Sequence, residues 1–327
     1  MVGKPNQTDI QDFTKSEAQT RTNEMDLKGL IHDKDYIADV DKKRAKENEP
    51  EATESDKKKP KTVAVAKPEL NILNKSVLHD TTRTVSNFLL HYLTNEPVEN
   101  IEIEAKLGTL VDLDSQNRFE FPVLSETVLN PEFNLRTRFQ SDMPASEHKH
   151  FNEFLNNAFR ESQRPGRVPI VYKHVKQVDL FYDSKNHGHD RVRVTRDQKD
   201  NRVLACVMKR RIADLYLYCP NDAFDVRISI SDEIPVSMPP QDTPPLLTRI
   251  KDRVGYQHQD VKIDLTMTIQ NDPRYESTKR HELEVEFNNT AGLRERAMRA
   301  KEGAEPSWDR RVQLFLDNIR ILRRENS

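Results

Sequence analysis

The stretch HELEVEF, residues 281–287, alternates charged and apolar side chains. Its three glutamates, Glu282, Glu284 and Glu286, share one face of a predicted β-strand, because successive side chains of a strand point to opposite faces. Carboxylates on one face lie only about 7 Å apart along the strand and repel one another. A solvated surface gains nothing from three like charges in a row. The stretch therefore predicts an acidic strand face whose repulsion something else offsets.

Bulk composition excludes several protein classes. The chain has 327 residues, a net charge of −2 and 32% charged residues, so no overall charge excess indicates a nucleic-acid binder. Its two cysteines, Cys206 and Cys219, show no CxxC spacing and suggest a reducing compartment. No apolar run approaches the ~18 residues of a membrane span, and no signal peptide is expected. The sequence lacks GxGxxG and GxxxxGK[ST] motifs, so a glycine-cradled nucleotide site is not expected.

Residues 1–69 differ from the rest of the chain. They contain 14 Lys and Arg, 15 Asp and Glu, and only Phe13 and Tyr36 as aromatic residues. Such a segment buries too little apolar surface to offset its ordering entropy. We predict a disordered charged tail over 1–69 and a folded domain over 70–327. The run DKKKPK at 56–61 is either a nuclear-import signal or a solvated charge run.

The folded part combines strands with a few helices. Amphipathic helices are predicted at 77–93, 146–159, 292–300 and 309–324. Strands are predicted at 100–108, 118–123, 133–139, 171–183, 191–197, 202–211, 224–234, 247–256, 261–269 and 281–287. Short turn sequences separate several of these strands, which favours an antiparallel meander. So many strands usually form a closed barrel or a sandwich.

The charged strand faces distinguish these two folds. In a sandwich the polar faces meet water and the apolar faces form the core. In a barrel with inward polar faces, amphipathic helices would instead cover the apolar outside. Acidic residues cluster on the first and last strands, whereas basic residues cluster on strand 247–256. This sorting favours the inward-facing barrel, because a bound cation and a bound polyanion together need both clusters.

A closed barrel makes its first and last strands neighbours. Glu102 and Glu104 would then lie beside Glu284 and Glu286, and four carboxylates favour Mg²⁺ or Mn²⁺ over Zn²⁺. The basic side chains suited to phosphate oxygens share a face of strand 247–256: Arg249, Lys251 and Arg253. The sequence therefore predicts a tunnel for a divalent cation and a phosphate-rich substrate.

The ordered motifs ExE, RVR, MKR, SDE, RxKxR, KxDxT and ExExE, spread over residues 80–325, resemble one family. The chain is similar to the fungal mRNA-capping RNA 5′-triphosphatases, the β-subunit of the capping enzyme, within the triphosphate tunnel metalloenzymes. This resemblance implies an eight-stranded antiparallel β-barrel tunnel with inward charged residues and flanking helices. It also implies a hydrolase that removes the γ-phosphate from the 5′-triphosphate end of nascent mRNA, the first step of cap formation.

The resemblance assigns roles by motif. It implies metal ligands at Glu102, Glu104, Glu284 and Glu286, with Glu282 in the same row. It implies catalytic roles for Glu233, which would orient or deprotonate the attacking water, and for Arg193, Lys209, Lys251 and Arg253, which would neutralise phosphate charge. Substrate-binding roles are predicted for Arg249, Lys106, Lys262, Asp264, Thr266, Asp179, Arg191 and Arg227. In KxDxT, Lys262 stands where the family often has arginine.

The same resemblance implies a cellular setting. It suggests the nucleus, a homodimer, and partnership with the mRNA guanylyltransferase and the RNA polymerase II C-terminal tail. Some family members dock the guanylyltransferase through a Trp-containing segment before the catalytic domain, whereas the single tryptophan here is Trp308. Two alternatives stay open. One is another tunnel enzyme, such as an inorganic triphosphatase, a thiamine triphosphatase, another nucleoside triphosphatase or an adenylate cyclase. The other is a non-catalytic RNA-binding β module.

Overall fold

The computed structural model describes residues 69–96, 98–132, 136–184, 191–272 and 274–325. The predicted tail, except for its last residue, and the run at 56–61 lie outside these ranges. So do the first part of the strand predicted at 133–139 and the turn that follows residue 184. None of the helices in the described ranges is long and apolar enough to cross a membrane.

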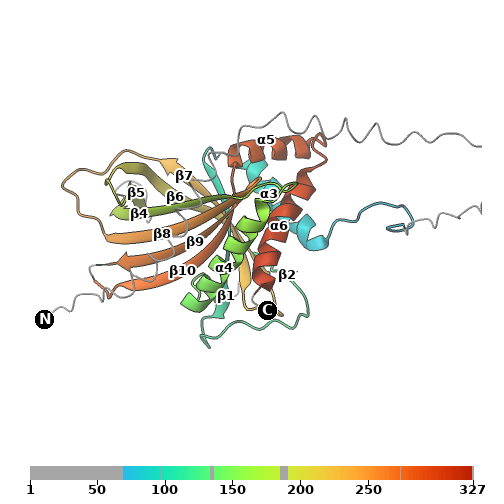
Figure 1. The fold of residues 1–327 in the computed structure, drawn as a ribbon, viewed down its shortest axis with the longest axis horizontal. Helices are drawn as coiled ribbons and strands as arrows, with labels where there is room; N and C mark the ends of the chain where they lie inside the picture. The colour runs from blue at the N-terminus through green and yellow to red at the C-terminus, as the bar shows by residue number, and fades with distance from the viewer. Residues whose placement is uncertain (1–68, 97, 133–135, 185–190, 273, 326–327) are drawn as a thin grey trace, which may run out of the picture. The chain divides into compact units, whose positions relative to one another are not determined.

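Within the described residues, eight antiparallel strands close into a barrel (Figure 1). In order around the barrel they are β1 (Ile101–Asp112), β10 (Thr278–Phe287), β9 (Val261–Asn271), β8 (Leu247–His258), β4 (Val171–Asp183), β5 (Arg191–Asp197), β6 (Val203–Tyr218) and β7 (Asp225–Pro235). The closure joins β1 to β10 with Glu104 opposite Glu286 and Lys106 opposite Glu284. The predicted eight-stranded antiparallel barrel is confirmed.

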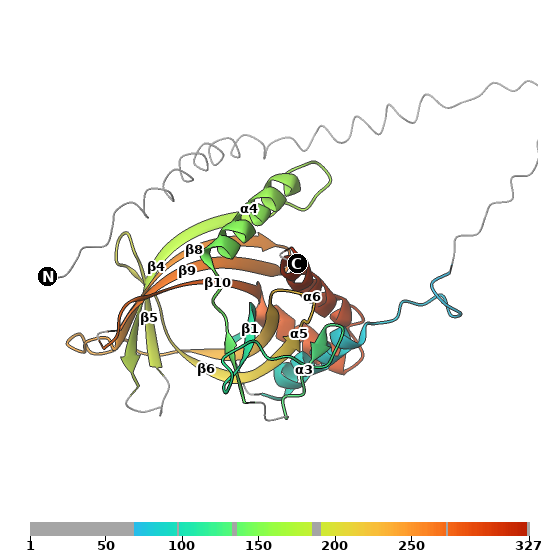
Figure 2. The same cartoon turned by 90° about the horizontal axis from the view of Figure 1, so that it is seen from below.

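Apolar side chains lie outside the barrel wall, where helices cover them. The helices are α3 (Asp80–Asn95), α4 (Ala145–Ser162), α5 (Thr290–Lys301) and α6 (Trp308–Arg324). Figure 1 shows α3, α5 and α6 gathered at one end of the sheet, and Figure 2 shows α4 over the strands β8, β9 and β10. Ile103, Leu265 and Val285, which alternate with the charged positions, belong to this outer core and are buried. The sandwich alternative is therefore wrong, because the apolar faces point outward.

The helices form because their apolar residues recur at helical spacing. On α3, Val85, Leu89 and Leu93 follow one another at every fourth position, and all three are 0% exposed. On α6, Phe315 stacks on Phe287 of β10 with ring centroids 4.3 Å apart. Each such fully buried side chain contributes about 1.5–3 kcal/mol of hydrophobic free energy. The helices thus supply the core that a barrel with a polar interior lacks.

The strand predicted at 118–123 is wrong. Of these residues only Arg118 makes a β-bridge, to Val111, and Pro122 cannot donate to a ladder. Arg118 instead forms a bidentate pair with buried Asp225, at 2.6 and 3.1 Å. The short strands β2 (Thr127–Val128) and β3 (Thr137–Gln140) pair with β6 and β1 respectively.

Candidate active site

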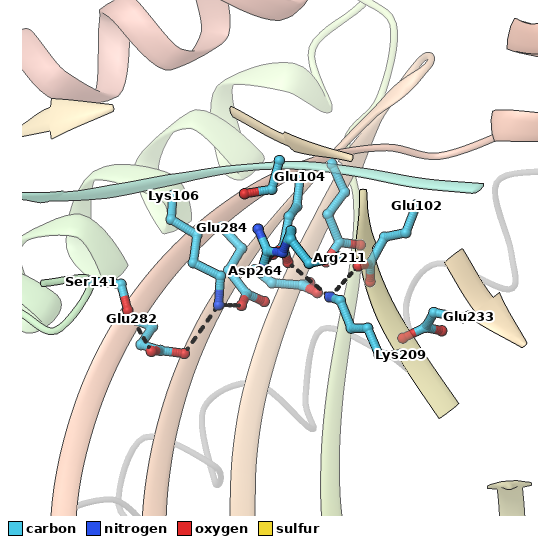
Figure 3. Close-up of polar contacts among 12 residues, drawn as sticks. Glu102, Glu104, Lys106, Ser141, Lys209, Arg211, Glu233, Asp264, Glu282 and Glu284 are labelled. Atoms are coloured by element: carbon cyan, nitrogen blue, oxygen red, sulfur yellow. Dashed lines mark hydrogen bonds and ion pairs between the residues drawn. The ribbon is translucent and has the colours of Figure 1, made fainter. Parts of the chain in front are cut away.

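The charged rows of the strands line the barrel interior. Glu104, Glu284, Asp179 and Asp264 are only 3%, 6%, 1% and 0% exposed. Solvated glutamates, which a non-catalytic β module would require, are therefore not what the fold presents. Figure 3 shows acidic and basic side chains from β1, β6, β9 and β10 converging inside the barrel.

Two acidic groups meet at Glu286. One carboxylate oxygen from each of Glu102, Glu104 and Glu286 lies within 4.8 Å of the others, and Asp264, Glu284 and Glu286 form a second such group. The β1–β10 register produces the first group, since it sets Glu104 opposite Glu286. Glu282 belongs to neither group. Its carboxylate accepts a hydrogen bond from Ser141 at 2.9 Å and pairs with Lys106 at 3.5 Å.

These donor sets fit a hard divalent cation. Carboxylate oxygens are the ligands that Mg²⁺ and Mn²⁺ favour. Burial, followed by the charge of Glu284, raises the pKa of Glu286 to about 7. Burial raises the pKa of Glu102 as well. The basic residues of the chain therefore leave the negative charge at Glu286 incompletely neutralised, as expected where a cation binds.

Glu284 behaves differently. Burial alone would raise its pKa, but Lys106 and Arg253 hold the pKa of this carboxyl well below its usual range. The Nζ of Lys106 lies 2.5 Å from one carboxylate oxygen and Arg253 lies 3.6 Å from the other. The two neighbouring glutamates on one face of β10 thus have opposite electrostatic environments.

On β6, Lys209 reaches the first acidic group. It forms an ion pair with Glu102 and lies 3.4 Å from Glu104. Arg211 also approaches Glu104, at 3.5 Å. Sequence reasoning missed Arg211, although it follows Lys209 by two positions and so shares its strand face.

Two further ion pairs join side chains of neighbouring strands β8 and β4 and of strands β5 and β7, which flank β6. Lys251 lies 2.7 Å from Asp179, and Arg193 lies 2.6 Å from Glu233. Burial would raise the pKa of Asp179, but Lys251 holds it below its usual range, and Thr195 donates a 2.7 Å hydrogen bond to it. Two of the predicted phosphate ligands are therefore held in place by acidic partners.

The KxDxT motif contacts the RxKxR motif directly. Arg253 pairs with Asp264 at 3.0 Å and donates from Nε to Thr266 at 3.2 Å. Lys262 lies 2.5 Å from Asp264 and 3.3 Å from Glu286. Gly255 stands opposite Asp264, and a Cβ there would lie 2.8 Å from Oδ1 of Asp264. The absence of a side chain at Gly255 leaves room for this carboxylate.

Three predicted substrate-binding arginines lie away from the acidic groups. Arg249 donates to Gln270 at 3.0 Å and stands over a phenylalanine ring, and Arg227 stands over another. Arg191 is exposed at the first position of β5. The structure thus brings the acidic groups together with most of the predicted phosphate ligands. These three arginines lie farther along the barrel wall.

A closed barrel with buried carboxylates facing lysines and arginines defines a tunnel-type phosphohydrolase. Residues 76–327 match the family described as mRNA capping enzyme, beta chain, and the chain belongs to this family. The predicted family is confirmed.

Named relatives agree with this family. The chain is 64% identical over 303 residues to the mRNA-capping enzyme subunit beta of Schizosaccharomyces pombe, covering 93% of this chain and 100% of that protein. It is 34% identical to the Cryptococcus neoformans subunit, covering 77% of this chain and 63% of that one. The structure resembles that of the S. pombe Pct1 RNA triphosphatase in complex with the Spt5 CTD, with a TM-score of 0.76 and 67% identity, covering 80% of this chain and all of that one.

Proposed function

We propose that this chain is a metal-dependent RNA 5′-triphosphatase, which removes the γ-phosphate from the 5′-triphosphate end of nascent mRNA in cap formation. The single observation that carries the proposal is the acidic triad Glu102, Glu104 and Glu286, half-buried to buried, within one tunnel that also holds Arg193, Lys251 and Arg253. The names of its relatives support it, since they are capping-enzyme β subunits and an RNA triphosphatase.

The basic residues would bind the γ-phosphate and neutralise its charge. In the structure each one is paired with a carboxylate, as Lys251 is with Asp179 and Arg253 with Asp264. A substrate phosphate offers these cations new oxygen partners in the same water-poor interior. Phosphoryl transfer depends mainly on positioning and on such charge stabilisation. These side chains would therefore supply most of the rate enhancement that the protein itself provides.

Glu233 would position the attacking water. Its carboxylate is fixed by Arg193 at 2.6 Å, beside the proposed γ-phosphate site. A carboxylate held in this way accepts a hydrogen bond from water and orients the oxygen for in-line attack. Arg193 would therefore both hold phosphate and orient Glu233.

Glu102, Glu104 and Glu286 would hold Mg²⁺ or Mn²⁺. When bound, such a cation polarises a phosphoryl oxygen as a Lewis acid. The chain contributes three carboxylate oxygens that are already close together, so binding requires little rearrangement of the protein. Asp264 and Glu284 would support this group by orienting Arg253 and Lys262.

The test is phosphate release from γ-labelled triphosphate RNA in Mg²⁺ or Mn²⁺, with and without EDTA. We expect EDTA to abolish release and Glu102→Ala to reduce it by about 10²-fold or more. Glu99→Ala, an exposed glutamate just before β1, is the matched control and is expected to keep wild-type activity. Wild-type activity in Glu102→Ala would sink the metal assignment, and full activity in EDTA would sink metal dependence.

We further propose that the chain acts in the nucleus as a homodimeric subunit of the capping enzyme. The Pct1 structure is a complex with the Spt5 CTD, which supports docking of a segment of a partner protein. In this view residues 70–327 are the catalytic domain and residues 1–69 are a tail for partners such as the guanylyltransferase or the RNA polymerase II tail. A chain of residues 70–327 should then release phosphate at the full-length rate, and a large loss would refute the division.

A further inference from the structure

The inner wall of the barrel continues past the acidic groups into an aromatic cluster. Lys106, Arg227 and Tyr216 lie side by side on β1, β7 and β6, since each is directly opposite the next in the sheet. They share the face of Glu104, so they belong to the interior row. Phe139 of β3 lies beside them, with its ring 6.0 Å from that of Tyr216.

Gly108 allows Phe139 to take this place. Gly108 continues the interior row of β1 after Glu104 and Lys106. A Cβ at Gly108 would lie 2.8 Å from the Phe139 ring and 2.2 Å from the carbonyl oxygen of Gln140. Any larger residue would displace β3. The missing side chain thus sets an aromatic ring over the inner face of the barrel wall.

The guanidinium of Arg227 has few hydrogen-bond acceptors in this cluster. Its guanidinium stands 5.0 Å from the Phe139 ring centroid, and Asp214 is 4.0 Å from its Nε. That Nε is buried and makes no hydrogen bond within the described residues. A buried guanidinium N–H without an acceptor is costly, and an oxygen of a bound ligand would supply that acceptor. The Phe139 and Tyr216 rings are themselves only half-buried.

A second arginine–aromatic pair lies at the same end of the barrel. Arg249, near the start of β8, stands 5.2 Å from the ring centroid of Phe181, near the end of β4. Antiparallel neighbours alternate in direction, so these positions lie toward the barrel end that Gly108 approaches on β1. This end therefore combines guanidinium groups with aromatic rings, the side chains on which single-stranded nucleic acids stack.

We propose that Phe139, Tyr216 and Arg227 form a nucleotide platform, on which the first base of the RNA stacks while Arg227 binds a phosphodiester oxygen. This inference rests on the proposed function and deepens it. Glu104 and Gly108 are four positions apart, about 13 Å along the strand. A triphosphate whose γ-phosphate lies at the acidic triad would thus extend toward the platform. The platform would make the tunnel prefer RNA ends over inorganic triphosphate.

The test compares two substrates that share the triphosphate. Phe139→Leu and Tyr216→Leu keep apolar volume but remove an aromatic face. We expect kcat/KM on short triphosphate RNA to fall about 5- to 100-fold, as the loss of one base–aromatic stack predicts, and kcat/KM on inorganic triphosphate to stay within about twofold. Phe139→Tyr, which keeps an aromatic ring at this position, should hydrolyse RNA at the wild-type rate. Phe88→Leu, which disrupts a comparable aromatic pair on α3 outside the barrel, should leave both substrates unaffected.

Binding provides a second measurement. Diphosphate-ended product RNA with 2-aminopurine as its first base should lose fluorescence on binding to the wild-type chain, and lose less with Phe139→Leu. Equal losses of activity on both substrates, or no loss on RNA, would overturn the platform while the proposed function stands. No phosphate release from triphosphate RNA by the wild-type chain would refute the proposed function itself, and the platform with it.

Discussion

Glu286 belongs to both acidic groups, so replacing it perturbs the site more directly than any other single change. We expect Glu286→Gln to have two opposite effects, since glutamine keeps the shape of the side chain and removes its charge. The metal-free fold should become more stable, because burial and the charge of Glu284 make the ionised Glu286 unfavourable. Phosphate release should fall by about 10²-fold or more, because one proposed cation ligand is lost.

The size of the stability gain follows from the pKa of Glu286. Its folded-state pKa is about 7, against an ordinary value of 4.5. The folded chain thus holds this proton more tightly than the unfolded chain does, so stability is full below pH 4.5 and is lost as the pH rises through 7. The difference between the two pKa values means that ionised Glu286 lowers the free energy of unfolding by at most about 3 kcal/mol at pH 8, and Glu286→Gln removes this penalty. For a domain of this size it would raise the melting temperature by roughly 6–12 °C.

The assay is thermal unfolding in EDTA at pH 5 and pH 8, repeated at pH 8 with Mn²⁺. The variant should melt well above the wild type at pH 8, only slightly above it at pH 5, and should gain less from Mn²⁺. Glu282→Gln, on the same strand face, is the charge-removal control. It should lower the melting temperature, because Lys106 loses an ionic partner and Ser141 a charged acceptor. A Glu286→Gln variant that melts at or below the wild type at pH 8 would refute this reasoning.

Three further predictions concern packing and pH. Gly255→Ala should lower the free energy of unfolding by about 1–3 kcal/mol, because the new Cβ would crowd Asp264, and should slow phosphate release. An unchanged melting temperature would contradict the close approach of Gly255 to Asp264. Burial lowers the pKa of His148 to about 4, so the unfolded chain binds its proton more tightly. The contribution of neutral His148 to the free energy of unfolding is therefore fully present above pH 6.5 and is lost as the pH falls toward 4. At pH 5 the loss reaches about 2 kcal/mol. Urea unfolding of wild type and His148→Gln at pH 7.5 and pH 5 checks it, and parallel pH profiles would argue against it. Arg323→Met should lower the free energy of unfolding, measured with urea, by about 3–5 kcal/mol, because buried Arg323 pairs with Glu126 at 3.0 Å. A loss under about 1 kcal/mol would contradict a structural role for this pair.

Strand parity predicted the inward charge of the barrel. Residues 171–183 and 191–197 form strands with the predicted bounds, because alternation and turn residues are local signals. The inward direction of the charged faces was predicted because rows of like charge repel one another and gain nothing on a solvated surface. At 118–123 the same alternation misled, since the pairing of Arg118 with Asp225 and the position of Pro122 outweigh strand propensity.

The grouping of acidic residues depends on distant pairing, so sequence alone could suggest it but not fix it. Three glutamates alternate on β10, and nothing local distinguishes Glu282 from Glu286. Only the register with β1, set by barrel closure, brings Glu286 to Glu102 and Glu104 and leaves Glu282 beside Ser141. Arg211 was missed for a similar reason, because its acidic partner lies on another strand.

The seam between β1 and β10 has a consequence for how the protein is made. Only three residue pairs close the barrel there, and two of them carry acidic residues of the site. The two strands are separated by most of the folded domain, so their contact is slow to find and comes late in folding. A nascent chain that has emerged only through β9 lacks both the closed tunnel and the triad. Completion of β10 thus acts as a safeguard, because a nascent chain without this strand lacks the proposed cation site and cannot hydrolyse RNA ends.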